Sequence, residues 1–409
     1  MNIEPEIVVE RILPGGLGLA HDDGRTIMVG LAAPGDRVRV RIDRVKGNVA
    51  FASIAEIIEP SAVRVDPPCP YFGRCGGCDF QQLNYQAQLD AKREIIRDCL
   101  RRIGGLESIP DFQITPAPNA WHYRPRAQWQ YDSIRKRIGY FESGSRRVCD
   151  VSECAVLTPE LQNELTRLRE RMQLGELPDD ARHFRAIAGD DVISIIDDKG
   201  RSPLSESRPV GIAGGPIAGS HSHVRDITRT FNGERYHLNA ASFFQANNDL
   251  LPSLLESAIG SERGGTAIEL YCGVGLFTLP LARRFEKVIG VESDPSGSDF
   301  ARKNLAEAGL MTAEIVNDDV TRWLENVGLD GALDFLLLDP PRTGAESRVI
   351  SGILRLKPKR ICYVSCDPAT LARDLKKLVA GGYKIDRLTA FDMFPQTHHV
   401  ETVVHLVAV

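Results

Sequence analysis

The chain has 409 residues, of which 43% are hydrophobic and 26% are charged, and its formal net charge is −5 at pH 7. This length exceeds the size at which one hydrophobic core keeps growing, so two or three domains are expected. The composition is that of a soluble globular protein, and no apolar run is long enough to cross a membrane. The net acidity argues mildly against a nucleic-acid partner, but a local basic surface would be enough to bind RNA.

The first residues, MNIEPEIVVERILPGG, lack the charged region and apolar core of a secretory signal. We therefore expect a cytoplasmic monomer that does not bind membranes. In a reducing compartment, the nine cysteines are expected to bind metal or to take part in catalysis rather than to form structural disulfides.

Residues 1–62 are expected to form a small antiparallel β-barrel of the OB type. The stretch DRVRVRIDRV (36–45) alternates strictly, with Arg37, Arg39 and Arg41 on one face and apolar residues on the other. Glycine and proline residues separate the short strands. The basic face is a candidate RNA-binding surface, although an ordinary solvated strand gives the same pattern.

Residues 63–231 are predicted to form a small central α+β domain that begins with a cysteine-rich loop. Within PPCPYFGRCGGCDF, the spacing C-x5-C-x2-C is formed by Cys69, Cys75 and Cys78. Three thiols at this spacing predict a metal site, with Cys149 or Cys154 as the fourth ligand. Four cysteines suit a structural zinc ion or an iron–sulfur cluster, and spacing does not choose between the two.

Two further segments of this domain carry a readable pattern. An apolar stripe predicts a helix over 85–103, which is expected to pack on the catalytic domain. The segment 121–141 interleaves aromatic residues with arginine and lysine, a composition that suits stacking on bases and binding of phosphate. The alternative is an amphipathic hairpin whose aromatic residues belong to the core.

From residue 232 to 409, apolar strands alternate with helices, which predicts an α/β domain with a Rossmann-like, mainly parallel sheet. The expected strands are 267–271, 287–292, 312–317, 333–339, 360–366 and 402–409. Ligands of such sheets bind at the carboxyl ends of the strands, so the residues that follow each strand are the candidates for function.

The turn after the first of these strands, ELYCGVGLF, contains Gly273 and Gly275 but lacks the third glycine of the dinucleotide fingerprint. Glu292 ends the next strand, where a carboxylate can accept hydrogen bonds from ribose hydroxyls. Together these residues indicate a nucleoside cofactor and favour S-adenosylmethionine over NAD. Asp318 or Asp319, after the third strand, is expected to lie near the adenine.

Three further candidates follow later strands. Asp339 stands in LDPPR, where two prolines fix the turn. Amino-methyltransferases place an aromatic residue at the position of Arg342, so this arginine argues against amino-group methylation. Cys366 ends the following strand in YVSCDPATLARDL, and Glu401 precedes the last strand.

The chain resembles the RNA 5-methyluridine methyltransferases, specifically the iron–sulfur branch known for uracil-C5 methylation of 23S rRNA. The resemblance covers nearly the whole chain and rests on a TRAM-like barrel and on CPYFGRCGGC, SFFQANN, ELYCGVG, LDPPR, SCDPATLARDL and FPQTHHVE. It implies S-adenosylmethionine-dependent methylation of carbon 5 of a uridine in RNA. The expected substrate is 23S rRNA, and tRNA is the alternative.

The resemblance also implies roles for individual residues. The ligands of a [4Fe–4S] cluster would be Cys69, Cys75, Cys78 and Cys154. The residues that bind S-adenosylmethionine would be Gln245, Tyr271, Gly273, Gly275, Glu292, Asp319 and Asp339. Cys366 would be the nucleophile and Glu401 the base. The chain departs from the family at Leu276, where relatives often have asparagine, and at Asp319, where relatives can have asparagine.

Methylation of carbon 5 needs both a thiolate and a base, the roles implied for Cys366 and Glu401. Attack of the thiolate on carbon 6 makes carbon 5 of uracil electron-rich, and the base must later remove the proton from carbon 5. The uridine must also leave its base stack.

Two other functions are considered. The first is amino-group methylation of a nucleobase, which leaves Cys366 without a role. The second is a non-catalytic iron–sulfur protein that binds RNA, but such a protein has no need for Gln245, Glu292, Asp339, Cys366 and Glu401 together. The cluster is expected to be structural, because the reaction transfers no electrons.

Overall fold

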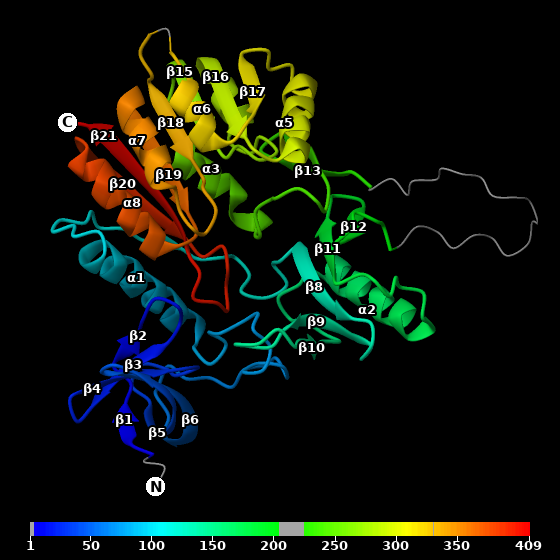
Figure 1. Cartoon of the computed structure of the whole chain (residues 1–409), viewed down its shortest axis with the longest axis vertical. Coiled ribbons are helices and arrows are strands. Elements are labelled where there is room, and N and C mark those ends of the chain that lie inside the picture. The colour runs from blue at the N-terminus through cyan, green and yellow to red at the C-terminus, as the bar shows by residue number, and fades with distance from the viewer. Residues whose placement is uncertain (1–3, 204–224, 330) are drawn as a thin grey trace, which may run out of the picture.

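The computed structural model describes residues 4–203, 225–329 and 331–409. An N-terminal barrel lies at one end, an α/β domain at the other, and a smaller central sheet beside them (Figure 1). Residues 204–224, which belong to the predicted central domain, lie outside the described part. None of the described helices has the length and apolar character that crossing a membrane requires.

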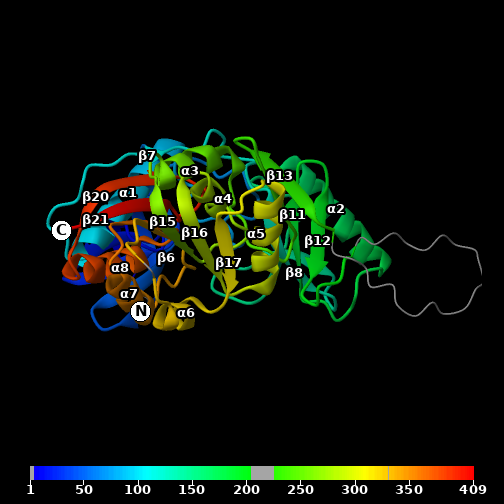
Figure 2. The same ribbon diagram turned by 90° about the horizontal axis from the view of Figure 1, so that it is seen from above.

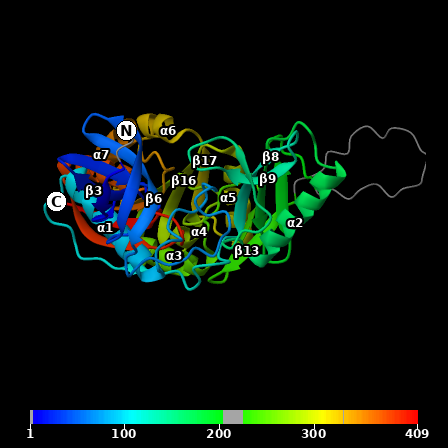
Figure 3. The same cartoon turned by 90° about the horizontal axis from the view of Figure 1, so that it is seen from below.

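The N-terminal region forms a six-stranded sheet in the order β1-β5-β6-β4-β3-β2. It departs from the predicted antiparallel barrel at one place, because β4 pairs with β6 in parallel. Its strands are β1 (Glu6–Val8), β2 (Arg11–Ile12), β3 (Gly18–Asp22), β4 (Arg25–Val29), β5 (Arg37–Lys46) and β6 (Val49–Glu59). The alternation of β5 is confirmed, because Val38 and Val40 are fully buried in the barrel core. Viewed from below, the barrel lies on the side of the C-terminal strands (Figure 3).

The arginine face of β5 is not a bare cationic surface. Arg37 and Arg39 both bind Glu6 on β1, and each also binds a second glutamate, Glu59 or Glu56, on β6. These exposed pairs contribute little to stability. They do reduce the positive charge that this face offers to RNA phosphates, so the sequence pattern overstated its basic character.

The end of the barrel is joined to the following chain by a buried ion pair. Asp36 is fully buried. It accepts hydrogen bonds from Arg64 Nη2 at 2.6 Å, from Ser61 N at 3.0 Å and from Ala33 N at 2.6 Å. Burial alone would raise the pKa of Asp36, but these hydrogen bonds and the positive charge of Arg64 lower it below its usual value.

The central region is a five-stranded antiparallel sheet in the order β10-β9-β8-β11-β12. Its elements are β8 (Arg126–Asp132), β9 (Arg137–Phe141), β10 (Val148–Asp150), α2 (Pro159–Leu174), β11 (His183–Ala188) and β12 (Ile193–Asp197). Figure 2 shows this sheet and α2 on the side of the molecule away from the C-terminus. Trp129 and Tyr131 are buried in the core of this sheet, and Tyr123 is buried as well. Of the two interpretations of the aromatic residues, burial is therefore the one that holds for these three.

The C-terminal region confirms the predicted Rossmann-like domain. Its eight-stranded sheet has the order β17-β16-β15-β18-β19-β21-β20-β7, with β21 antiparallel to both of its neighbours. The strands are β7 (Ile114–Thr115), β15 (Gly264–Leu270), β16 (Phe285–Glu292), β17 (Ala313–Asn317), β18 (Phe335–Leu338), β19 (Arg360–Ser365), β20 (Tyr383–Phe391) and β21 (Glu401–Ala408). The order reverses between β15 and β18, which places a ligand site at the ends of these strands.

Helices cover both faces of this sheet (Figure 2). They are α3 (Leu251–Ile259), α4 (Thr278–Ala282), α5 (Pro295–Glu307), α6 (Val320–Asn326), α7 (Ser347–Leu356) and α8 (Pro368–Ala380), with a 3₁₀ turn, η1 (Asn248–Leu250), before α3. A two-stranded hairpin, β13 (Ile227–Phe231) and β14 (Glu234–Leu238), precedes them, and β14 contacts α5.

Helix α1 (Tyr85–Arg102) lies between the barrel and the catalytic domain (Figure 1). It contacts α8 and β2, and Ile95, Ile96 and Leu100 belong to the same apolar core as one face of the large sheet. Strand β7 pairs with β20. Residues from the stretch before 116 therefore complete the catalytic domain.

We predict that Asp36→Asn destabilises the barrel by about 3 kcal/mol, because it leaves the Arg64 guanidinium without its partner in a buried setting. Hydrogen exchange of the strand amides of β3 to β6 measures the effect. Since the pKa of Asp36 is lowered on folding, the stability it contributes is present above the unfolded pKa of about 4 and is lost as the pH falls through the folded value. Asp43→Asn, in an exposed pair with Arg41, is the control. Equal effects of the two substitutions would contradict this account.

Candidate active site

The turn after β15 is bent into a conformation that few residues adopt. Tyr271 has a φ of 64°, and Gly273 and Gly275 have φ values of 54° and 89°. Only glycine adopts this left-handed region without steric cost, so Tyr271 is strained. Gly273 N donates a hydrogen bond to Glu292 Oε2 at 2.9 Å, which ties the glycine turn to the end of β16. The strain and the carboxylate lie where the sequence predicted a cofactor site.

A second contact brings two predicted cofactor residues together across the chain. Gln245 Nε2 donates to Asp339 Oδ2 at 3.1 Å. Both residues line a cavity of about 30 Å³ together with Tyr271, Gly273 and Leu276. Desolvation raises the pKa of Asp339 to about 7, although the hydrogen bond from Gln245 opposes the shift.

Cys366 and Glu401 are brought together by strand pairing. Strands β19 and β21 are antiparallel with Ser365 opposite Thr402, so Cys366 and Glu401 are the next residues in register. Asp367 then caps α8 by accepting hydrogen bonds from Ala369 N and Thr370 N at 3.0 and 2.8 Å. The helix therefore starts directly after the cysteine, which fixes the Cys366 backbone between a strand and a helix N-terminus.

The electrostatics of this pair are set by burial and by one nearby cation. Burial, Glu401 and Asp339 raise the pKa of the Cys366 thiol to about 12, while Arg342 opposes the shift. Glu401 is 1% exposed and its Oε1 has no hydrogen-bond partner among the described residues. Burial and Asp339 raise the pKa of Glu401 well above its usual value, and Arg342 again opposes the shift. The site holds two carboxyl groups and a thiol beside a single exposed arginine.

Three of the predicted cofactor residues, Gly275, Glu292 and Asp319, do not line this cavity, and Asp319 has another role. It is exposed and caps α6, where its Oδ1 accepts a hydrogen bond from Arg322 N at 3.0 Å. Its neighbour Asp318 binds the Arg322 side chain. Neither residue lines the cavity that contains Gln245 and Asp339.

The sequence interpretation missed two residues that line the same cavity. Glu269, in the middle of the apolar strand AIEL, is 1% exposed, and Thr278 donates a hydrogen bond to it. A charged residue within a buried strand was the available signal. Phe243 lines the cavity too, yet 64% of it is exposed. The Arg126 guanidinium lies 5.3 Å from its ring centre. Phe243 stands next to Phe244 in the motif SFFQANN, and nothing in the sequence shows that one of the two is exposed and the other buried.

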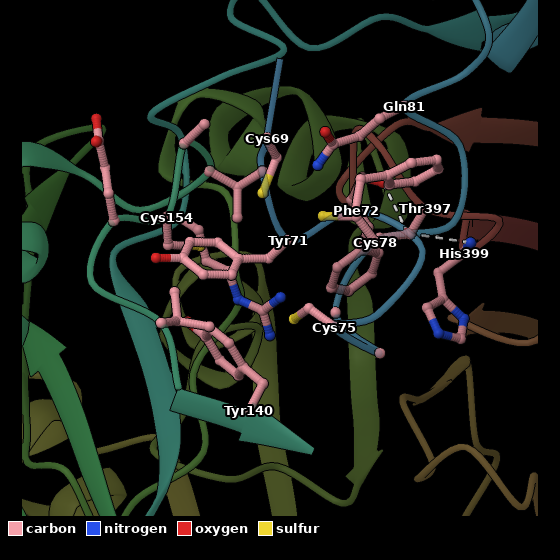
Figure 4. Close-up of a pocket in the computed structure, with 18 of the residues that line it drawn as sticks. Cys69, Tyr71, Phe72, Cys75, Cys78, Gln81, Tyr140, Cys154, Thr397 and His399 are labelled. Atoms are coloured by element: carbon pink, nitrogen blue, oxygen red, sulfur yellow. Dashed lines mark hydrogen bonds between the residues drawn. The ribbon is translucent and has the colours of Figure 1, made fainter. Parts of the chain in front are cut away.

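The predicted cysteine ligands gather at one place. Cys69, Cys75, Cys78 and Cys154 all line a cavity of about 260 Å³. In Figure 4, the sulfur atoms of Cys69, Cys75 and Cys78 point into this cavity from the cysteine loop, and Cys154 approaches from another segment. Cys149 does not line it, and its sulfur accepts a hydrogen bond from Arg74. Burial raises the pKa of Cys75 and of Cys78 to about 12.

The geometry does not show a bound-ion site. Over residues 4–203, 225–329 and 331–409, no three His, Cys, Asp or Glu side chains are arranged to hold a metal ion. The four thiols therefore share a cavity without converging on one point. The wall of this cavity also contains Arg342, Phe394, Thr397 and His399, so it adjoins the Cys366 site although its cysteines lie far away in sequence.

Comparisons with known proteins identify the family of the chain. The sequence profile of the tRNA (uracil-5-)-methyltransferases matches residues 227–409, and the TRAM domain profile matches residues 4–55. RlmD, the 23S rRNA (uracil(1939)-C(5))-methyltransferase of Alkalilimnicola ehrlichii, is 32% identical, over 97% of this chain and 95% of that protein. An uncharacterized RNA methyltransferase of Thermotoga maritima is 31% identical, over 98% of each chain.

The fold has a solved counterpart as well. The crystal structure of the Pyrococcus abyssi tRNA (uracil-54, C5)-methyltransferase in complex with S-adenosyl-L-homocysteine is similar with a TM-score of 0.73 and 27% sequence identity. The similarity covers 98% of this chain and 100% of that chain. Because relatives more than 30% identical align with nearly the whole chain, the protein belongs to the RNA uracil-5-methyltransferase family.

Proposed function

We propose that this protein transfers a methyl group from S-adenosylmethionine to carbon 5 of a uridine in RNA, through a covalent bond between Cys366 and carbon 6 of uracil. The observation that carries the proposal is the pairing of β19 with β21, which sets a thiol and a carboxyl group side by side next to Asp339. Neither amino-group methylation nor simple RNA binding uses such a pair.

The cofactor would bind along the glycine turn, with only a part of it at the small cavity lined by Gln245 and Asp339. Glu292 would accept hydrogen bonds from the ribose hydroxyls. The support is its place at the end of β16 beside the glycine turn, where its Oε2 accepts a hydrogen bond from Gly273 N. Gln245 and Asp339 would contact the methionine part of S-adenosylmethionine or lie between the cofactor and the uridine. Leu276 lines the cavity with an apolar surface, so a polar contact made by asparagine in relatives would be absent. Asp319 would contact the cofactor only with the carboxylate oxygen that does not cap α6.

The reaction balances with these two side chains. The Cys366 thiolate bonds to carbon 6 of uracil, and the electrons of the C5–C6 double bond move toward the ring carbonyl as an enolate. Carbon 5 then takes the methyl group, the bond between sulfur and methyl in the cofactor breaks, and S-adenosylhomocysteine forms. The Glu401 carboxylate removes the proton on carbon 5, the double bond reforms, and the thiolate leaves.

Burial and charge act against each other on the two reacting groups. Burial raises the pKa of Cys366 and of Glu401, so it disfavours the thiolate and the carboxylate that the reaction uses. The positive charge of Arg342 lowers the pKa of both groups and would support the two anionic forms. A loop uridine, turned out of its stack at low cost, would meet the exposed ring of Phe243 at the mouth of the cavity.

For the substrate we propose 23S rRNA. The support is the full-length alignment with the Alkalilimnicola enzyme, whose substrate is 23S rRNA. The structure with the TM-score of 0.73 belongs to a tRNA enzyme, and this keeps tRNA as the alternative. The proposed reaction at Cys366 is the same for a uridine in either RNA.

We also propose that Cys69, Cys75, Cys78 and Cys154 hold a [4Fe–4S] cluster. The support is that all four thiols, and no other cysteine of the described residues, line one cavity. A cluster binds each thiolate through a different iron, so its ligands need not converge on a single point. When bound, the cluster would hold the cysteine loop against the central sheet, and its iron would favour the thiolate forms that burial disfavours.

We expect Cys366→Ala to abolish methyl transfer while S-adenosylmethionine still binds, because the thiol does not line the cofactor cavity. Incorporation of labelled methyl groups into RNA and calorimetric binding measure the two effects. Cys362→Ala, a buried cysteine on the same strand, is the matched control and should retain turnover. If Cys366→Ala still methylates RNA, the mechanism through a covalent bond to Cys366 is contradicted.

Glu401→Gln should trap the enzyme after methyl transfer, because the amide cannot remove the proton from carbon 5. We expect a covalent complex of protein and methylated RNA on a denaturing gel. The rate at which methylated RNA is released should fall by about 10²–10⁴-fold. Glu314→Gln, an exposed strand residue, serves as the control. If Glu401→Gln releases methylated RNA at the wild-type rate, another group is the base.

Anaerobically purified protein is expected to be brown and to contain about four iron and four sulfide per chain. Cys75→Ser should lose most of this iron, whereas Cys149→Ser should keep it, because Cys149 does not line the cavity. Metal analysis and the absorption spectrum decide the outcome. A colourless protein with bound zinc would refute the cluster.

A further inference from the structure

The segment 392–400 joins β20 to β21 and leads directly into Glu401. Its two ends lie side by side, because Phe391 pairs with Glu401 at the end of the two strands. The segment between them contains no helix or strand. Its conformation must therefore be set by the residues that contact it, and most of these lie outside the catalytic sheet.

One face of α1 supplies the first set of contacts. Lys92 and Asp392 are both fully buried and form an ion pair, and Lys92 Nζ also donates to the Phe394 carbonyl at 3.1 Å. Gln88, one turn earlier on the same face, accepts a hydrogen bond from Gln396 N at 2.9 Å. Its Nε2 donates to Gln396 Oε1 at 3.0 Å. The segment is thus held from two successive turns of one helix.

Gln396 is the residue held most firmly. Its φ is 69°, in the left-handed region where a residue with a side chain is strained. Its carbonyl accepts hydrogen bonds from Asp79 N and Phe80 N at 3.1 and 3.0 Å. Such a conformation persists only when the surrounding structure determines it fully. Here the determinants are Gln88 and the two residues that follow Cys78.

Two neighbours complete the contacts. Asp79 pairs with the His398 ring and accepts a hydrogen bond from His398 N at 2.8 Å. Tyr123 donates from its hydroxyl to the Pro395 carbonyl at 3.0 Å. From Asp392 to His398, the segment is therefore fixed by α1, by the end of the cysteine loop and by the start of the central region.

The side chain of Glu401 has no comparable support of its own. It is buried, and its Oε1 has no hydrogen-bond partner in the described part of the chain. Pairing with β20 fixes its backbone on one side, but the direction of the carboxyl group depends on packing against the chain that enters the strand. A shift of about 1 Å in a catalytic group can reduce a rate by about 100-fold.

We propose that Gln88 and Lys92 are positioning residues, which hold the segment 392–400 so that the Glu401 carboxylate reaches the proton on carbon 5. This inference rests on the proposed function and adds two residues of α1 to the reaction. Because Glu401 acts only after methyl transfer, the loss of these contacts should slow release of the covalent intermediate more than its formation.

The test compares Gln88→Ala with Gln86→Ala in the full-length protein. Gln86 lies on the same helix but is exposed, and among the described residues its side chain hydrogen-bonds only to Asp90. Each variant is mixed with S-adenosylmethionine and unmodified target RNA, and the reaction is quenched with denaturant over time. Methyl transfer and covalent complex are then measured in the same samples. We expect Gln88→Ala to slow release by about 10- to 100-fold relative to methyl transfer, and Gln86→Ala to match the wild type.

A loss of folded protein would lower both steps together, so the ratio of the two rates separates positioning from stability. If Gln88→Ala does not fold, Gln88→Met takes its place, because it keeps the length of the side chain but removes both of its hydrogen bonds to Gln396. If the folded variant has the same ratio of release rate to methyl-transfer rate as the wild type, the proposal is overturned.

RNA that contains 5-fluorouridine separates this proposal from the proposed function. Fluorine on carbon 5 cannot be removed as a proton, so the wild type, Gln88→Ala and Gln86→Ala should all form the complex to the same extent. No complex in the wild type would refute the proposed function itself. Suppose instead that the wild type forms the complex with 5-fluorouridine RNA, but that Gln88→Ala has the wild-type ratio of release rate to methyl-transfer rate with unmodified RNA. This result would refute only the role of α1.

Discussion

The antiparallel pairing of β19 with β21 is the constraint on which the site depends. The other strands that form the centre of the sheet are parallel, and a parallel last strand would carry its first residue to the opposite edge. Because β21 runs the other way, the residue before Thr402 meets the residue after Ser365. Cys366 and Glu401 thus meet at the edge where the glycine turn and Asp339 also end. A thiol, two carboxyl groups and the cavity beside the glycine turn share one end of one sheet.

The segments that precede the catalytic domain in sequence take part in this site. Helix α1 fills one face of the large sheet and also binds the segment that leads into Glu401. The cysteine cavity is walled in part by that same segment and by Arg342. Under the proposed function, the cysteine loop supports the catalytic edge directly, which gives it a structural role next to the chemistry. The barrel contacts α1 through β2, so it is joined to the site through the same helix.

The sequence predicted the Rossmann-like sheet, the barrel and the residues at the strand ends, because alternation and apolar runs are local signals. It placed Cys366 and Glu401 at strand ends but could not show that they face each other, since that depends on the direction of β21. It left base stacking and burial open for Tyr123, Trp129 and Tyr131, and the structure shows that all three are buried. The pairing of Arg37 and Arg39 with glutamates on β1 and β6 was equally out of reach, because those partners lie on separate strands.

The most direct test of the central claim is to identify the protein atom that bonds to uridine. The protein is incubated with S-adenosylmethionine and total RNA that contains 5-fluorouridine, and the covalent complex is digested and analysed by mass spectrometry. The account predicts one modified peptide, with a methylated fluorouridine on Cys366, and sequencing of the attached RNA identifies the substrate. A complex through another residue, or no complex from protein that binds S-adenosylmethionine, would contradict it.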